Sequence, residues 1–173
     1  RDTGRTRAVL DAAAKAAGWG RAMAPRSGLG IAFYFSHRGY FASVAEVKVA
    51  DDGTVKVVKV WVAGDVGRQI VNPSGANNQI VGSTLDAINA TLNQQITVAN
   101  GRVEQSNFDD YPLLRIADAP PVAVEMVTSD NPPTGLGEPA YPPVPPAITN
   151  AIFAATGVRV RSLPVDTALL KKA

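Results

Sequence analysis

The chain has 173 residues, of which 46% are hydrophobic and 18% are charged, and its formal net charge is only +2. This length and composition predict a single globular domain over residues 1–173 with a sizeable core, and they exclude a disordered chain. The basic residues form no long run and do not alternate with aromatic residues, so we expect no nucleic acid among the partners. No apolar run reaches the ~20 residues of a transmembrane helix, so we also expect no membrane span.

The counts of cysteine and histidine limit the chemistry of the chain. There is no cysteine, and His37 is the only histidine. The chain can therefore supply no disulfide and no iron–sulfur ligand, and a lone histidine makes no metal site. We predict no metal ligands here and a surface or turn position for His37. Because the first residue is not Met and no signal-peptide pattern follows, we expect a piece of a longer protein.

The first elements are a helix and a loop. Apolar residues recur at helical spacing over residues 5–17, Thr3 is placed to cap the start, and Gly18 is placed to end the helix. Four glycines and one proline over residues 18–30 predict a loop.

Three strands are predicted next, over residues 30–36, 40–50 and 55–62. The sequence Asp-Asp-Gly at 51–53 is typical of a tight turn between the last two. We therefore expect an antiparallel hairpin over 40–63 with one buried face.

A long helix is predicted from Asn72, as its cap, and Pro73 to about Leu92. Its interior contains Gly75 and Gly82. Glycine inside a helix costs about 1 kcal/mol relative to alanine. We interpret these glycines as points of close packing against a backbone or a ligand.

The last third combines a hairpin, a rigid loop and a helix. Asn-Gly at 100–101 predicts a hairpin between strands at 94–98 and 102–106. Residues 129–146 hold seven of the thirteen prolines, which predicts a stiff irregular loop. The remaining predicted elements are a strand over 122–128, a helix from the last prolines to Gly157, and a final strand over 158–163. Together these elements predict an α+β fold in which antiparallel hairpins pack with about three helices.

The candidate for chemistry is Glu138, in the loop sequence Gly-Leu-Gly-Glu-Pro over 135–139. One interpretation is an acidic residue favoured by the dipole of the following helix. The other is a general base, because a carboxylate in a dry pocket has a raised pKa and takes a proton near neutral pH. In that case Gly135 and Gly137 would let the loop backbone approach a cofactor closely.

Gln79 is the second candidate, within the predicted long helix. It is interpreted either as an exposed amide or as a donor–acceptor pair that grips an oxo group or the edge of a pterin. Gly82 would then permit close approach on the same face, since positions three apart on a helix are neighbours.

Three segments together resemble the large subunit of the molybdenum hydroxylases, the xanthine dehydrogenase and aldehyde oxidase family. "GDVGRQIVNP" followed by "NNQIVGS" is similar to its glycine turn, Asn-Pro and Gln-x-x-Gly segment. "GRVEQSNFDDYPLLRI" and "SDNPPTGLGEPAYPPVPPAITNAIFAATGVRVRSLP" resemble the isoquinoline 1-oxidoreductase beta-subunit type. The likeness extends from the first helix to Leu163 and implies the C-terminal part of a molybdopterin-binding region.

The resemblance implies a cofactor, a reaction and partners. The cofactor would be molybdopterin with molybdenum, usually the cytosine dinucleotide form in bacteria, contacted by Gln79, Gly82 and Gly137. Glu138 would act as general base on a molybdenum-bound hydroxyl, so that an N-heterocycle is hydroxylated or an aldehyde is oxidised. Electrons would leave through [2Fe–2S] clusters on an iron–sulfur small subunit. The rest of the large subunit would complete a pocket for a small aromatic or aldehyde substrate.

The chain also departs from the family pattern. Val81 stands where an acidic residue commonly follows the glutamine, and "STLDAINATL" is more polar than the usual helix. The other cofactor loops of the family lie outside this sequence, so we expect the chain alone to be inactive. A non-catalytic structural or interaction domain that retains the fold stays open as the alternative. The compartment also stays open between bacterial cytoplasm and periplasm.

Overall fold

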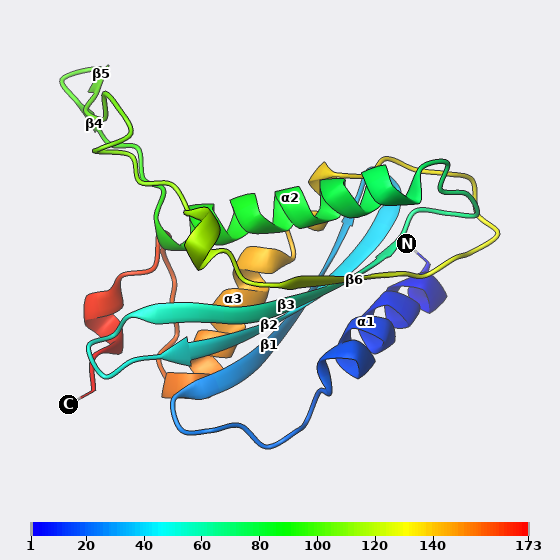
Figure 1. The fold of residues 1–173 in the computed structure, drawn as a ribbon, viewed down its shortest axis with the longest axis horizontal. Helices are drawn as coiled ribbons and strands as arrows, with labels where there is room; N and C mark the ends of the chain where they lie inside the picture. The colour runs from blue at the N-terminus through cyan, green and yellow to red at the C-terminus, as the bar shows by residue number, and fades with distance from the viewer. Residues whose placement is uncertain (1, 173) are drawn as a thin grey trace.

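The computed structural model describes residues 2–172 and has the predicted α+β class (Figure 1). The helices are α1 (Thr3–Ala17), α2 (Pro73–Leu92) and α3 (Val144–Thr156), with short 3-10 helices η1 (Ile116–Asp118), η2 (Glu138–Ala140) and η3 (Thr167–Leu170). The strands are β1 (Ser27–Ser36), β2 (Gly39–Val49), β3 (Val55–Asp65), β4 (Val98–Ala99), β5 (Arg102–Val103) and β6 (Val122–Met126). No helix among residues 2–172 is long and apolar enough to cross a bilayer.

The main sheet has the strand order β1-β2-β3-β6. The β2–β3 pair confirms the predicted antiparallel hairpin, with a register irregularity at Glu46 and Val47. β6 runs parallel to β3, with Val60 opposite Val122, and this pairing was not predicted. It follows from the connection through α2, because a crossover brings the next strand back in the same direction.

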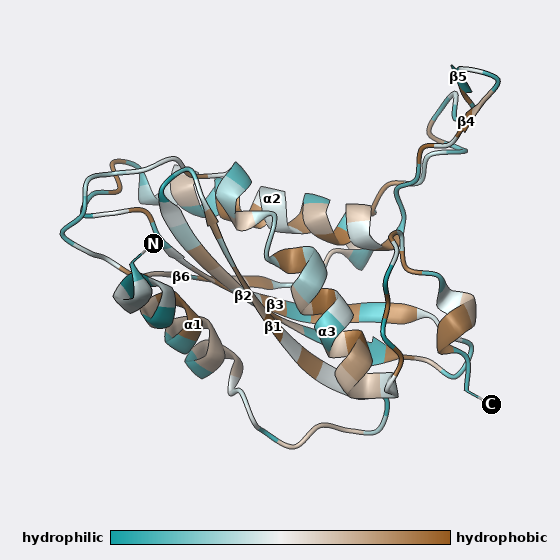
Figure 2. Ribbon diagram, turned by 180° about the vertical axis from the view of Figure 1, so that it is seen from behind, coloured by the Kyte–Doolittle hydropathy of each residue, from teal (hydrophilic) through white to brown (hydrophobic). Residues whose placement is uncertain are grey.

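The sheet is buried on both faces, so the expectation of one buried face was wrong. Phe41 and Val47 of β2 pack into the cluster formed with α2 and α3, whereas Tyr40 and Val44 of the same strand pack into the cluster formed with α1. Figure 1 shows α1 on one side of the sheet and the other two helices on the opposite side, and Figure 2 shows the apolar segments of the strands between them.

α3 lies directly on β1 at two glycines that the sequence had suggested were loop residues. A β-carbon on Gly28 would stand 2.4 Å from the carbonyl oxygen of Ala151, and one on Gly30 would stand 2.1 Å from that of Ala147. Any side chain at these positions would therefore collide with the helix backbone. This close packing places the N-terminus of α3, and the loop before it, at one end of the sheet.

The helix ends follow the predicted chemistry with one correction. The side chain of Asp2, and not that of Thr3, caps α1 by accepting hydrogen bonds from the N–H groups of Gly4 and Arg5. Asn72 caps α2 as predicted. Gly18 and Gly157 end α1 and α3 in the left-handed conformation, also as predicted.

Two predicted strand regions differ from the structure. Residues 158–163 form no strand, because they pair with none of the strands of either sheet. The Arg159 guanidinium lies over the Phe153 ring of α3, 3.6 Å from its centroid, and donates to the Asn150 side chain. The hairpin around Asn100 keeps only the short strands β4 and β5, and it projects from the end of α2 (Figure 1).

Candidate cofactor-facing site

The loop before α3 returns to α2 and brings Gly137 against Gln79. A β-carbon on Gly137 would stand 2.8 Å from the side-chain oxygen Oε1 of Gln79. Gly137 also has a φ of 109° and a ψ of −87°, a conformation that side-chain-bearing residues rarely adopt. Both observations explain why this position is glycine, and they join two of the predicted site residues.

Gln79 and Gly82 lie three residues apart on α2, and both are exposed. A β-carbon on Gly82 would meet no atom of the described chain within 4 Å. The expected packing of Gly82 against a backbone therefore does not occur within residues 2–172. This face of α2 is open to a group supplied from outside the described residues.

Glu138 is the first residue of η2, beside Gly137. Its side chain is 80% exposed, so the expected dry pocket around the carboxylate is absent from residues 2–172. Its nearest ionisable neighbour is His37, whose Nε2 lies 3.9 Å from Glu138 Oε2. His37 is an exposed turn residue, as predicted, but its position beside Glu138 was not foreseen because the two are far apart in sequence.

A buried carboxylate that the sequence reasoning missed secures the neighbouring loops. Asp65 ends β3, is 1% exposed, and accepts hydrogen bonds of 2.7 and 2.8 Å from the Arg5 guanidinium. It also accepts from the Gly67 N–H and the Ser129 hydroxyl, each at 2.9 Å. Burial is the largest influence on the pKa of Asp65 and acts to raise it, but these hydrogen bonds and the Arg5 charge outweigh it, so the pKa lies below its usual value.

Backbone contacts extend this junction toward the site loop. The N–H of Arg68 donates to Asn131, and the N–H of Thr134 donates to Val66, each at 2.9 Å. Gly67, at a φ of 98°, lies so close to Pro132 that a β-carbon would stand 2.4 Å from its carbonyl oxygen. The segment that leads to Glu138 is therefore tied to the end of the sheet.

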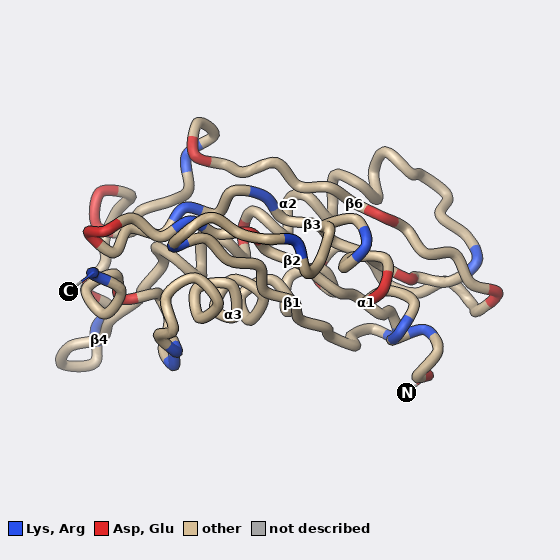
Figure 3. Tube along the Cα trace, turned by 90° about the horizontal axis from the view of Figure 1, so that it is seen from below, with Lys and Arg blue, Asp and Glu red and all other residues tan. Residues whose placement is uncertain are grey.

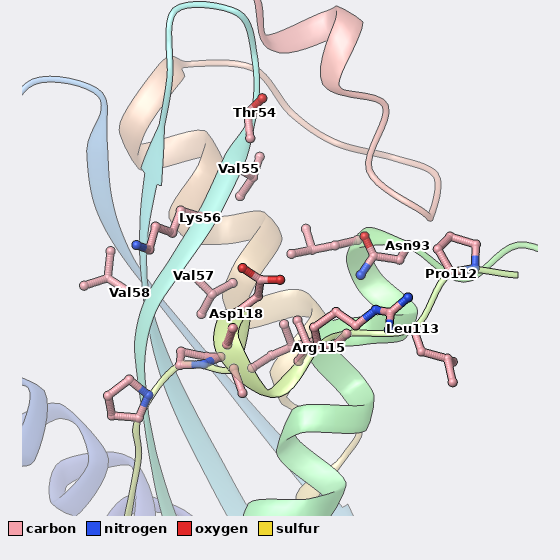
Figure 4. A pocket seen from close by; sticks show the side chains of 17 residues that line it. Thr54, Val55, Lys56, Val57, Val58, Asn93, Pro112, Leu113, Arg115 and Asp118 are labelled. Carbon is pink, nitrogen blue, oxygen red and sulfur yellow. The ribbon is translucent and has the colours of Figure 1, made fainter. Parts of the chain in front are cut away.

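A sizeable cavity lies elsewhere, between the start of β3 and the segment 112–121 (Figure 4). Its volume is about 640 Å³, and its lining includes Leu92 at the C-terminal end of α2. Gln79 is thirteen residues from that end, about 20 Å along the helix axis at 1.5 Å per residue. None of the predicted site residues lines this cavity, so its size does not identify the site.

Residues 2–172 offer hydrogen-bonding groups for a polar cofactor and no cluster of metal ligands. No group of three or more His, Cys, Asp or Glu residues gathers in the described chain as a metal would require. Basic and acidic residues are interspersed along the trace (Figure 3). The exposed Gln79 amide offers both a donor and an acceptor, and the N–H of the buried Gly137 beside it donates to no acceptor within residues 2–172.

Comparison with known proteins identifies the family of the chain. The family described as the molybdopterin cofactor-binding domain matches residues 7–120. The isoquinoline 1-oxidoreductase subunit beta of Brevundimonas diminuta is 34% identical over 169 residues, which is 95% of this chain and 22% of that protein. The membrane-bound aldehyde dehydrogenase [pyrroloquinoline-quinone] of Gluconacetobacter polyoxogenes is 40% identical over 126 residues, which is 72% of this chain and 16% of that protein.

Solved structures share the fold. The aldehyde oxidoreductase from Desulfovibrio gigas superposes with a TM-score of 0.64 at 26% identity, over 73% of this chain and 14% of that one. The chain thus spans about a fifth or less of the length of the curated relatives described above. Because the family match includes well over half of its residues, the chain belongs to the molybdopterin cofactor-binding domain family.

Proposed function

We propose that the chain is the C-terminal part of the molybdopterin-binding subunit of an oxidoreductase that hydroxylates an N-heterocycle or oxidises an aldehyde. The likeness to an isoquinoline oxidoreductase subunit and to aldehyde-oxidising enzymes supports both substrate classes. The cofactor would be molybdopterin with molybdenum, in its cytosine dinucleotide form. The partners would be the rest of the large subunit and an iron–sulfur small subunit carrying [2Fe–2S] clusters.

The observation that carries the proposal is that the Gln79 side chain lies against Gly137, with Gly82 three residues further along α2 and Glu138 next to Gly137 in the chain. The bound molybdenum–pterin group supplies a Lewis acid and an electron sink. The Gln79 amide and the Gly137 N–H would hold its polar edge through hydrogen bonds. Gly82 would leave room for it above α2, because a side chain there would occupy that space.

Glu138 would then act as the general base. Its carboxylate is held on a loop tied to the sheet, and it is free of hydrogen bonds within residues 2–172. Such an oxygen is able to accept the proton lost by the attacking oxygen nucleophile. The rest of the subunit would exclude water from this surface, which makes a carboxylate a stronger proton acceptor than it is in water.

The direct test is Glu138→Gln in the assembled enzyme. The amide keeps the shape of the side chain but accepts no proton, so we expect kcat to fall by roughly 10²–10⁴. The molybdenum content should stay unchanged because Glu138 is not assigned to hold the cofactor. Glu125→Gln, at an exposed position on β6, is the matched control and should leave kcat unchanged. Near-normal turnover of Glu138→Gln would remove Glu138 from the role of base.

The chain by itself supplies one wall of the proposed pocket, since Gln79 and Glu138 are both exposed. We therefore expect the purified 173-residue chain to be inactive and to bind little or no cofactor. Metal analysis checks this, and stoichiometric molybdenum in the isolated chain would contradict it.

A non-catalytic interaction domain is the second candidate. The projecting hairpin favours it, because Val98, Val103 and Phe108 are 64%, 56% and 74% exposed. Such apolar side chains are typical of surfaces that another protein covers. Full turnover of the assembled enzyme after loss of both Gln79 and Glu138 side chains would support this candidate over the first.

A further inference from the structure

The tip of the β1–β2 hairpin places the chain's one histidine against the loop that carries Glu138. The distance from His37 Nε2 to Glu138 Oε2 is 3.9 Å. This lies just beyond hydrogen-bond length. Hydrogen bonds at catalytic groups are often long in ligand-free structures and shorten when the ligand is bound.

Two features of the backbone make this approach specific. His37 has a φ of 51°, in the left-handed region that non-glycine residues seldom occupy, and the following Arg38 has a φ of 65°. On the other side of the contact, a β-carbon on Gly135 would stand 3.3 Å from the β-carbon of His37. Gly135 therefore brings the loop against His37, where the sequence had suggested that it approached a cofactor.

The hydrogen bond at Nδ1, the second ring nitrogen of His37, determines whether Nε2 carries a proton. Nδ1 lies 2.7 Å from the hydroxyl oxygen of Ser36. If the hydroxyl donates to Nδ1, the neutral ring carries its proton on Nε2, which faces the Glu138 carboxylate. The opposite tautomer would set a nitrogen lone pair against a carboxylate, so the geometry favours an Nε2–H donor.

We propose that His37 is a positioning residue for Glu138. The Glu138 side chain is 80% exposed and has several rotatable bonds, and no other side chain among residues 2–172 is paired with its carboxylate. An Nε2–H donor limits the orientations of that carboxylate and leaves its second oxygen free to accept a proton. Misplacement of a reacting group by about 1 Å costs on the order of 10²-fold in rate, so such a restraint affects turnover.

The contact between His37 and Glu138 lies within this chain, so it is tested without the cofactor. The single imidazole of the chain makes its signals easy to identify. In NMR spectra of the 173-residue chain, the His37 ring signals need no assignment among several histidines. Glu138→Gln should shift these signals, and the nitrogen spectrum should show the proton on Nε2. Glu104→Gln, at an exposed position beyond β5, is the matched control and should leave the ring signals unchanged. Unchanged ring signals in Glu138→Gln, with the backbone amide spectrum intact, would overturn the proposal.

The consequence for turnover rests on the proposed function and is measured in the assembled enzyme. His37→Leu and His37→Gln have the same backbone strain, but only the glutamine keeps an N–H donor near the position of Nε2. We expect His37→Leu to lower kcat by about 10-fold with KM and molybdenum content unchanged, and His37→Gln to recover most of that loss. Equal kcat in the two variants would overturn the positioning role.

The two proposals fail separately. If the His37 ring signals do not change in Glu138→Gln, the role of His37 is overturned and Glu138 stays a candidate base. A verified contact together with normal turnover of Glu138→Gln would overturn the proposed base.

Discussion

The side chain of Gln79 occupies the space that a side chain at Gly137 would need, since a β-carbon added to Gly137 would stand 2.8 Å from Gln79 Oε1. The contact joins the second turn of α2 to the loop before α3, two segments that are distant in the sequence. It therefore determines where Glu138 lies relative to the exposed face of α2.

Replacement of Gly137 by alanine should destabilise this junction. An alanine at position 137 would have to adopt a φ of 109°, and its β-carbon would displace the Gln79 side chain. We therefore expect the free energy of unfolding to fall by about 1–3 kcal/mol. Urea denaturation of the chain measures the change. Gly157→Ala is the matched control, because its φ of 74° is also left-handed but no atom lies within 4 Å of the new β-carbon. Equal losses in both variants would show that the contact with Gln79 has no energetic effect.

Gly82→Ala should change stability and cofactor content in opposite directions. In the isolated chain the new methyl group meets no atom, and alanine favours the helix, so stability should rise by about 0.5–1 kcal/mol. In the assembled enzyme the same methyl group should obstruct the cofactor and lower molybdenum content. Urea denaturation and metal analysis give the two readouts. A stabilised chain with full molybdenum content would place the cofactor away from this face.

Gln79→Ala should leave the fold intact and weaken the hold on the cofactor. The side chain is exposed, so the free energy of unfolding should change by no more than about 0.5 kcal/mol. Molybdenum content of the assembled enzyme should fall several-fold because a donor and an acceptor are lost. Asn77→Ala, at another exposed position of α2, controls for changes in the helix itself. Full molybdenum content in Gln79→Ala would contradict its proposed role.

Asp65 should make the stability of the chain depend on pH in the acid range. Its pKa in the folded chain is below the unfolded value of about 3.9, so its contribution is complete above that value and is lost as pH falls through the folded pKa. Asp65→Asn should cost about 3 kcal/mol at neutral pH, because it leaves the Arg5 guanidinium without its carboxylate. It should also flatten the fall in melting temperature at acid pH.

Thermal unfolding at a series of pH values compares wild type with Asp65→Asn. Asp110→Asn is a useful control, because the pKa of that exposed carboxyl is also lowered, chiefly by hydrogen bonds from the Asn107 and Ser106 N–H groups. It lies on the projecting hairpin segment and supports no core contact, so its effect should be small. An unaltered acid response in Asp65→Asn would contradict the assignment to Asp65.

Much of the local structure could be predicted because its causes lie within a few residues. The side chain of Asn72 hydrogen-bonds the start of its own helix, and Gly157 adopts the left-handed conformation that ends α3. Asn100 and Gly101 likewise form a left-handed turn between β4 and β5. Expectations were wrong where a distant segment decides the outcome. Residues 158–163 form no strand because neither sheet of the fold pairs with them, and Arg159 lies against α3 instead.

By itself, the sequence determined the class of fold, most of the helix ends and the choice of the candidate residues Gln79, Gly82, Gly137 and Glu138. The fold class and helix ends rest on spacing and local backbone preference, which short stretches of sequence contain, whereas the candidate residues rest on the family resemblance as well. Only the tertiary structure decided that both faces of the sheet are buried, that Asp65 is held by Arg5, and that His37 lies beside Glu138. These contacts join segments far apart in the chain, and they form only when the sheet brings those segments together; two glycines of β1 likewise let α3 lie directly on the sheet.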